Sequence, residues 1–140
     1  MEKVQLQITG FQWNEEREET GVETVWDAEY GERNGSHYVM YEEVTPDFPV
    51  PVKCRIKFKK DYLELVKQGP ITTQMFFETG KKNEVYYGTP YGSLAMEIDT
   101  KSIEMEMRGH VICITIKYGL TTWDEPISDC RLDIKVTLPA

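Results

Sequence analysis

Apolar and polar residues alternate at every second position along most of this sequence. The alternation is clearest in segment 52–59, where four apolar residues are separated by Lys or Arg, and it recurs near 4–8, 94–98, 103–107, 112–118 and 132–138. Successive side chains of a β-strand point to opposite faces, so a period of two is typical of strands with one buried and one solvated face. None of these segments fits the spacing of an amphipathic helix better. The sequence therefore predicts an all-β fold.

Turn-forming residues divide the alternating segments at intervals of about ten residues. Asn34-Gly35 predicts a two-residue hairpin, because both residues tolerate the positive φ angles of a type I′ turn. Further breaks are expected at Lys60-Asp61, Gln68-Gly69-Pro70, 80–83, Asp99-Thr100-Lys101 and Arg108-Gly109-His110. The expected strands span about 3–10, 22–32, 37–44, 52–60, 62–68, 72–78, 84–88, 92–99, 102–108, 111–121 and 129–138. Two of these segments can be parts of one strand, which gives about nine or ten strands.

The two terminal segments are both strongly alternating and could pair with each other. Such pairing would remove the exposed edges that a row of strands otherwise leaves. We therefore predict a single antiparallel up-and-down β-barrel of about eight to ten strands over residues 1–140, with a two-sheet sandwich as the alternative. The interior of such a barrel is wide enough for side chains or for one small ligand.

The charge balance restricts the partners of this chain. It carries 24 acidic and 16 basic residues, a net charge of −8, which opposes general binding to nucleic acids or anionic membranes. No apolar run is long enough for a membrane helix, and the first residues alternate rather than forming a signal peptide, so we expect a cytoplasmic protein. Cys54, Cys113 and Cys130 are few and odd in number, which favours free, buried thiols.

The residue inventory does not favour an enzyme or a metalloprotein. His37 and His110 are the only histidines, and the sequence contains no His-x-x-x-His, Cys-x-x-Cys or Gly-x-Ser-x-Gly motif. We expect no metal and no cofactor.

The Asn34-Gly35 hairpin allows one face of the barrel wall to be predicted. Its register places Trp26, Tyr30, Val39, Tyr41 and Glu43 on a common face. The same register puts Asp27 opposite Glu42 on the other face, an unfavourable pair of like charges.

If that common face is the inner one, Glu43 lies near the mouth of an aromatic cavity. Lys67 is in phase with Leu63 and Leu65 and could point inward to offset the charge of Glu43. We therefore take as candidate ligand-binding residues Trp26, Tyr41, Glu43, Lys67, Tyr87 and Tyr91. The alternative is a structural ion pair that caps a filled core.

Segment 53–59 also carries a stripe of basic residues at every second position. The stripe could form a track for a partner that bears phosphate. Alternatively, it is the solvated face of a strand whose neighbours supply acids such as Glu64.

Several short motifs of this sequence resemble those of one known family. They are Tyr41-Glu42-Glu43, Phe76-Phe77-Glu78, Thr89-Pro90-Tyr91-Gly92-Ser93-Leu94, Asp99-Thr100 and Ile116-Lys117-Tyr118-Gly119-Leu120. The chain resembles, from about residue 3 to residue 138, the YwiB-type, calycin-like β-barrel proteins, a bacterial family of unknown function. The resemblance implies a barrel like that of lipocalins and fatty-acid-binding proteins, and it implies no activity. Lys67 stands where we expect an Arg in this family, which weakens any role in recognising an anion through a bidentate contact.

These observations lead to three hypotheses for the function. The first is a non-enzymatic, lipocalin-like barrel that binds a small, partly apolar ligand. The second is a scaffold with a filled barrel, which contacts a protein partner through the acidic loop 14–21 or the proline-rich loop 45–51. The third is an enzyme that uses Glu43 as an acid or base, although no partner base or nucleophile is recognisable.

Overall fold

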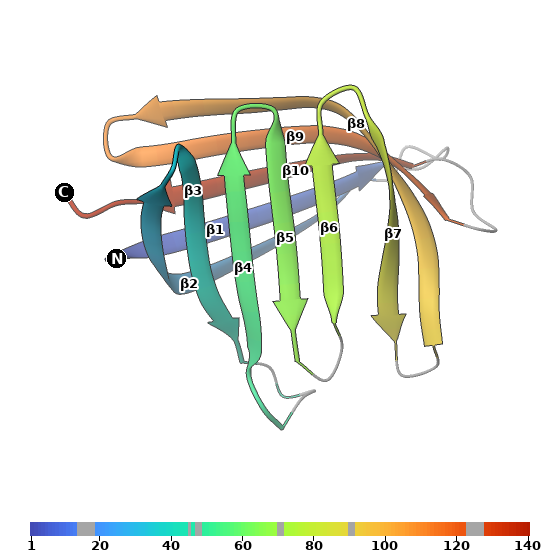
Figure 1. Cartoon of the computed structure of the whole chain (residues 1–140), viewed down its shortest axis with the longest axis horizontal. Coiled ribbons are helices and arrows are strands. Elements are labelled where there is room, and N and C mark those ends of the chain that lie inside the picture. Colours follow the sequence, from blue (N-terminus) through green and yellow to red (C-terminus); the bar gives the residue numbers. More distant parts are fainter. Residues whose placement is uncertain (14–18, 45, 47–48, 70–71, 90–91, 123–127) are drawn as a thin grey trace.

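The described residues of this chain form ten antiparallel strands (Figure 1). The structure is a computed structural model that describes residues 1–13, 19–44, 46, 49–69, 72–89, 92–122 and 128–140. The strands are β1 (Glu2–Trp13), β2 (Glu19–Arg33), β3 (Ser36–Glu43), β4 (Val52–Lys59), β5 (Tyr62–Gln68), β6 (Thr73–Glu78), β7 (Lys82–Thr89), β8 (Gly92–Arg108), β9 (Val111–Thr122) and β10 (Ser128–Thr137). Each strand pairs with the strands before and after it in the sequence, and β1 also pairs with β10. The prediction of an all-β, antiparallel up-and-down barrel is confirmed.

The first and last strands close the barrel. Their ladder runs from Gln5 opposite Thr137 to Trp13 opposite Asp129, along nearly the whole of β1. Closure pairs the backbone groups that two free edge strands would expose. The predicted pairing of the terminal segments is therefore confirmed.

β8 turns the corner between two differently oriented parts of the barrel. In Figure 1 its first half runs beside β7, and its second half crosses the top of the molecule together with β9 and β10, at a steep angle to β3–β6. The ladder between β8 and β9 shifts by one residue between Thr100 and Ser102, which is a β-bulge. Bulges bend a strand and increase its twist, so they allow a strand to pass from one orientation to another. The predicted break at 99–101 is thus a bulge within one strand, and segments 92–99 and 102–108 are its two halves.

Apolar side chains from all ten strands meet inside the barrel. In β4 the residues at 52, 54, 56 and 58 are buried, while Lys53, Arg55 and Lys59 between and after them are exposed. The largest fully buried side chains are Phe58, Phe77, Leu6, Ile56, Leu63, Ile98, Ile112, Ile114, Ile116 and Ile134. Each stabilises the fold by about 1.5–3 kcal/mol relative to an exposed position.

The three cysteines are free, but they do not share one environment. Cys54 and Cys130 are buried on the inner face, as expected. Cys113 is only partly buried, and the expectation of a buried thiol is wrong there. It lies between Ile112 and Ile114, which are both buried, so its side chain points to the outer face of β9.

The β2–β3 hairpin has the predicted turn and register. Asn34 and Gly35 have φ angles of 54° and 80°, as a type I′ turn requires, and Arg33 lies opposite Ser36. The register continues to Ala28 opposite Tyr41, so the inner face contains the predicted side chains of both strands.

Candidate functional site

The barrel interior contains a cavity of about 190 Å³. Six strands contribute to its wall, and the register places all of the contributing side chains on the inner face. The lining residues are Ile8, Thr24, Tyr41, Glu43, Ile56, Leu63, Leu65, Lys67, Leu132 and Ile134. Most of this wall is aliphatic, and its charged groups come from the ends of β3 and β5.

Glu43 and Lys67 form the charged end of this cavity. The Lys67 ammonium nitrogen lies 2.6 Å from Oε1 of Glu43, and the two side chains are 34% and 19% exposed. Their partial exposure places the ion pair at the mouth of the cavity, with the aliphatic wall deeper inside. Both side chains line the cavity, which is the case that the sequence left open as the inner-face possibility.

Cys54 lies on β4 between the two charged residues. Its backbone is opposite Tyr41 of β3 on one side and opposite Lys67 of β5 on the other. The thiol donates a hydrogen bond to Oε1 of Glu43, with an Sγ to Oε1 distance of 3.3 Å. Burial, reinforced by the Glu43 carboxylate, raises the pKa of Cys54 to about 12, so the group is a neutral thiol at neutral pH.

Tyr41 completes the polar end of the site. Its side chain is 5% exposed, and its hydroxyl is buried beside the Cys54 thiol but makes no well-formed hydrogen bond among the described residues. Burial, with smaller contributions from Cys54 and Glu43, raises the pKa of this hydroxyl far above its usual range. The group is therefore a neutral phenol that can donate one hydrogen bond.

The remaining candidate residues have different positions. Trp26 packs against Tyr41, with ring centroids 6.0 Å apart, but does not line the cavity. Tyr87 lies on β7, where its backbone is opposite Thr73, and nothing is described for its side chain. Tyr91 lies outside the described residues. The structure thus brings together Tyr41, Glu43 and Lys67 of the predicted set, with Trp26 beside them.

The opposite end of β3 is filled by aromatic rings. His37 stacks on Phe58 at 4.8 Å between centroids, and the Tyr30 hydroxyl lies 2.6 Å from Nδ1 of His37. His37 and Glu43 are six residue positions apart along β3, which is about 20 Å at 3.3 Å per residue. The charged groups of the cavity therefore lie far from His37, whereas Leu63 of its wall is opposite Phe58.

The pairing of β2 with β3 stops close to the cavity. The last pair is Ala28 opposite Tyr41. Asp27 and Glu42, the next residue on each strand, are not paired with each other. The sequence predicted that Asp27 and Glu42 would lie opposite each other as an unfavourable pair of like charges. The ladder between β2 and β3 ends just before this pair would form. β2 continues beyond this point with β1 as its partner, and β3 continues with β4.

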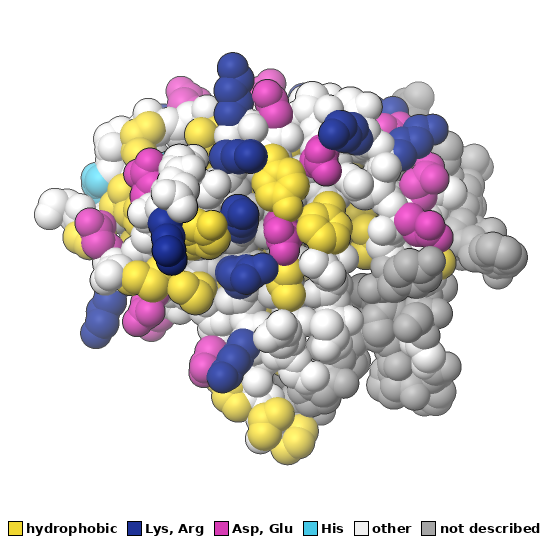
Figure 2. Space-filling model, in the orientation of Figure 1, with side chains coloured by type: hydrophobic (Ala, Val, Ile, Leu, Met, Phe, Trp, Pro, Cys, Tyr) yellow, Lys and Arg dark blue, Asp and Glu magenta, His cyan; other side chains and the backbone are white. Residues whose placement is uncertain are grey.

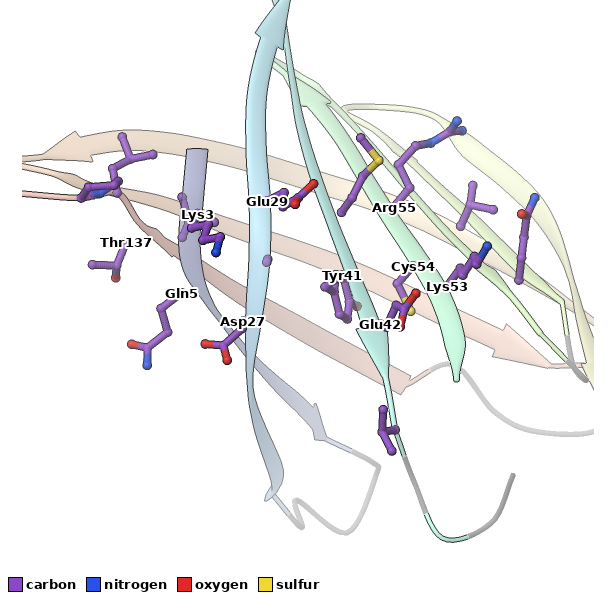
Figure 3. Close-up of a pocket in the computed structure, with 18 residues that line it drawn as sticks. Lys3, Gln5, Asp27, Glu29, Tyr41, Glu42, Lys53, Cys54, Arg55 and Thr137 are labelled. Carbon is purple, nitrogen blue, oxygen red and sulfur yellow. The ribbon is translucent and has the colours of Figure 1, made fainter. Parts of the chain in front are cut away.

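An outer groove lies over the region where β2 and β3 part. It has a volume of about 1300 Å³, and Figure 3 shows its charged side chains on β1, β2, β3 and β4. Lys3, Lys53 and Arg55 supply positive charge, and Asp27, Glu29 and Glu42 supply negative charge. Tyr41 lines both this groove and the inner cavity, and Cys54 lines the groove but not the cavity.

The basic stripe of segment 53–59 lies on the outer face of β4. Figure 2 shows basic, acidic and hydrophobic side chains interleaved on this side of the molecule. Arg55 forms an ion pair with Glu64 at 3.1 Å, and the Lys57 ammonium lies 5.7 Å from the centroid of the Tyr38 ring. The predicted pairing with Glu64 is confirmed, and it favours a solvated strand face over a phosphate-binding track.

Sequence reasoning missed most of the aliphatic wall and the position of Cys54. The alternation marked these residues as inward-facing, but it did not separate those that line empty space from those that fill the core. No three His, Cys, Asp or Glu side chains gather in a metal-binding arrangement within the described ranges. Among those same residues, the structure contains no helix with the length and hydropathy needed to cross a membrane.

Comparison with solved structures gives a match over nearly the whole chain. The crystal structure of the ywiB protein from Bacillus subtilis is similar with a TM-score of 0.83 and 17% sequence identity, covering 99% of this chain and 93% of that one. At this identity the match shows the fold alone. No curated protein matches the sequence. The model of a family described as a domain of unknown function, DUF1934, matches residues 6–134. The chain therefore belongs to the DUF1934 family.

Proposed function

We propose that this protein is a non-enzymatic binding protein that holds a small, partly apolar molecule inside its barrel. The observation that carries the proposal is the cavity of about 190 Å³, whose wall is mostly aliphatic and whose charged groups, Glu43 and Lys67, lie together. Ligand sites are commonly apolar cavities with a few placed polar groups that fix the orientation of the ligand. The unpartnered hydroxyl of Tyr41 supports the same proposal, because a buried polar group without a partner destabilises the protein until something binds to it.

The size of the cavity limits the size of the ligand. At about 30 Å³ per water, the volume of about 190 Å³ corresponds to roughly six waters. An engineered apolar cavity of about 150 Å³ accepts benzene. The ligand is therefore about as large as benzene with a short polar group attached, and a long lipid chain does not fit.

The chemistry of the polar end favours binding over catalysis. The Cys54 thiol has a pKa of about 12 and so is not a thiolate nucleophile at neutral pH. Glu43 is engaged by both Lys67 and Cys54, which leaves it poorly placed to act as a general base. These groups are suited to orienting a ligand.

Benzene is a suitable probe of whether the cavity is hollow and accessible. We expect saturable changes in the methyl NMR signals of Ile8, Ile56 and Leu65 when benzene is added to the intact protein. Leu65→Phe should abolish them by filling the cavity. The control is Val66→Phe, which makes a similar change on the adjacent residue of β5, whose side chain lies in the outer groove.

Two outcomes would contradict the proposal. If the wild-type methyl signals do not respond to benzene, the barrel is filled and the ion pair only caps its core. If Val66→Phe abolishes binding while Leu65→Phe preserves it, the ligand site lies in the outer groove. Thermal melts of both variants establish that each one folds.

A further inference from the structure

We propose that the ligand carries a zwitterionic head, an ammonium next to a carboxylate, on a compact aliphatic body. This inference rests on the proposed function, because it concerns the ligand of the same cavity. An aliphatic α-amino acid of the size of leucine represents the class. Its head would lie at the Glu43–Lys67 pair, and its side chain would fill the aliphatic part of the cavity.

The charge balance of the site favours a ligand without net charge. Glu43 and Lys67 compensate each other at 2.6 Å. The neighbouring Cys54 thiol and Tyr41 phenol are neutral, since burial raises the pKa of each. A lone carboxylate or a lone ammonium would add one uncompensated charge to this balanced pair, in a partly desolvated position where an unpaired charge is costly. A zwitterion avoids this penalty.

The hydrogen-bonding capacity left open in the site matches such a head. Oε1 of Glu43 pairs with the Lys67 ammonium and accepts a hydrogen bond from Cys54, whereas no contact to Oε2 is seen within the described part of the chain. The Lys67 ammonium has three N–H groups and makes one described contact, and the Tyr41 hydroxyl has no partner. A ligand can therefore use one acceptor, Oε2 of Glu43, and the donors of Lys67 and Tyr41.

A zwitterion can use this capacity without breaking the ion pair. Its ammonium would donate to Oε2 of Glu43, while its carboxylate would accept from Lys67 and from the Tyr41 hydroxyl. The two dipoles then lie antiparallel, so each charge of the ligand faces its opposite. Burial of the Tyr41 hydroxyl on the wall of the cavity gives this arrangement a donor that the free protein leaves unused.

The aliphatic wall defines the other half of the ligand. Apart from the polar end, the wall consists of Thr24 and the aliphatic residues Ile8, Ile56, Leu63, Leu65, Leu132 and Ile134, and among the described lining residues only Glu43 and Lys67 are charged. A second charged group on the ligand would be buried here without a group of opposite charge, since Thr24 offers only a neutral hydroxyl. The class is therefore restricted to zwitterions whose body is a short, branched hydrocarbon.

Four probes with similar branched aliphatic bodies test the inference. They are L-leucine, 4-methylpentanoate, 3-methylbutylamine and 3-methylbutan-1-ol, each titrated into the intact protein and followed by methyl NMR and calorimetry. We expect L-leucine to bind at least ten-fold more tightly than any of the others. The acid, the amine and the alcohol each lack one or both charges of the zwitterion.

Two variants should change which of the four probes binds most tightly, one in favour of the acid and the other in favour of the amine. Glu43→Gln leaves the charge of Lys67 uncompensated, so 4-methylpentanoate should become the tightest of the four. Lys67→Met leaves Glu43 uncompensated, so 3-methylbutylamine should become the tightest. The control is Glu42→Gln, which removes a carboxylate from the adjacent residue of β3 on the exposed outer face and should preserve the preference for L-leucine.

Each of the other results overturns the inference. Tighter binding of the acid or the amine to the wild type would show that the site selects one charge, and equal binding of the alcohol would show that it ignores the head. If benzene binds but none of the four probes does, the ligand is not a zwitterion of this class, and the proposal of a hollow, ligand-binding barrel is retained. If benzene fails as well, the proposed function fails with it.

Discussion

The ion pair between Glu43 and Lys67 joins β3 to β5 across the strand between them, β4, which contributes neither charge. Glu43 is at the end of β3 and Lys67 is near the end of β5, and β4 runs between them, with Cys54 opposite Lys67 and hydrogen-bonded to Glu43. The two charges meet at 2.6 Å because the curvature of the barrel turns both side chains toward its axis. The polar end of the cavity is therefore built from three neighbouring strands.

Removing one partner of this pair should destabilise the protein more than removing both. Glu43→Gln or Lys67→Met leaves a partly buried charge uncompensated, and we expect each to cost about 1–2 kcal/mol, between the values for surface and buried pairs. The double variant should lose less than either single variant, so it should regain more than half of the summed loss. Urea unfolding of the four proteins forms a double-mutant cycle, and a coupling energy near zero would show that the pair contributes nothing to stability.

Stability should fall steeply in alkaline solution. The pKa of Cys54 is raised from 9.0 to about 12 in the folded protein, so the unfolded state loses this proton first as the pH rises. The contribution of the protonated Cys54 thiol to the free energy of unfolding is fully present below about pH 9 and is lost progressively between pH 9 and about 12. Tyr41 and Tyr118 have raised pKa values from burial and act in the same direction.

The variant Cys54→Ala isolates the thiol contribution to this pH dependence. Its free energy of unfolding should decline less steeply above pH 9, by at most about 1.4 kcal/mol per pH unit. The slopes are compared rather than the absolute stabilities, because the substitution also removes a buried side chain. Identical slopes for the two proteins would mean that the thiol ionises equally easily in the folded and unfolded states.

The three thiols should react at very different rates in the folded protein. Cys113 is partly exposed on the outer face, whereas Cys54 and Cys130 are buried and have raised pKa values. We expect iodoacetamide at neutral pH to label Cys113 first, followed by the other two only on unfolding. Peptide mass mapping measures the order, and rapid labelling of Cys54 would contradict the environment described for it.

Relieving the like charges beside the outer groove should strengthen the β2–β3 ladder. Asp27→Asn removes one of the two carboxylates that follow the last pair, Ala28 opposite Tyr41. We expect a gain of a few tenths of a kcal/mol in stability and slower amide exchange at Glu42. Glu29→Gln changes an acid of the same groove that lies within the paired part of β2, and it should leave the exchange at Glu42 unchanged.

The β2–β3 turn should be sensitive to the loss of its glycine. Gly35 has a φ of 80°, a conformation that a residue with a Cβ rarely adopts. Gly35→Ala should therefore cost about 1 kcal/mol even though the added Cβ would meet no atom within 4 Å. Asn34→Gly, at a φ of 54°, should be much better tolerated. Thermal unfolding of both variants distinguishes backbone strain from a steric clash.

The sequence by itself determined the barrel and placed Tyr41 and Glu43 on one common face of the wall, while the inward direction of that face and of Lys67 was only one of the possibilities. Period-two alternation is a local property, so it assigns each residue to a face without knowledge of its neighbours. The Asn34-Gly35 turn then fixed the register of β2 against β3, because a two-residue loop allows one pairing. The closure of β1 on β10 followed from the need to cover two free edges.

Only the tertiary structure decided that part of the interior is hollow and where its polar end lies. The volume left inside a barrel depends on the sum of side chains from six strands and on the tilt of those strands, which no local pattern contains. The place of Cys54 beside the Glu43–Lys67 pair depends on the registers of β3, β4 and β5 together. The bulge near Thr100 likewise arises where β8 must change direction to close the barrel, so the sequence there indicated a break rather than a bend.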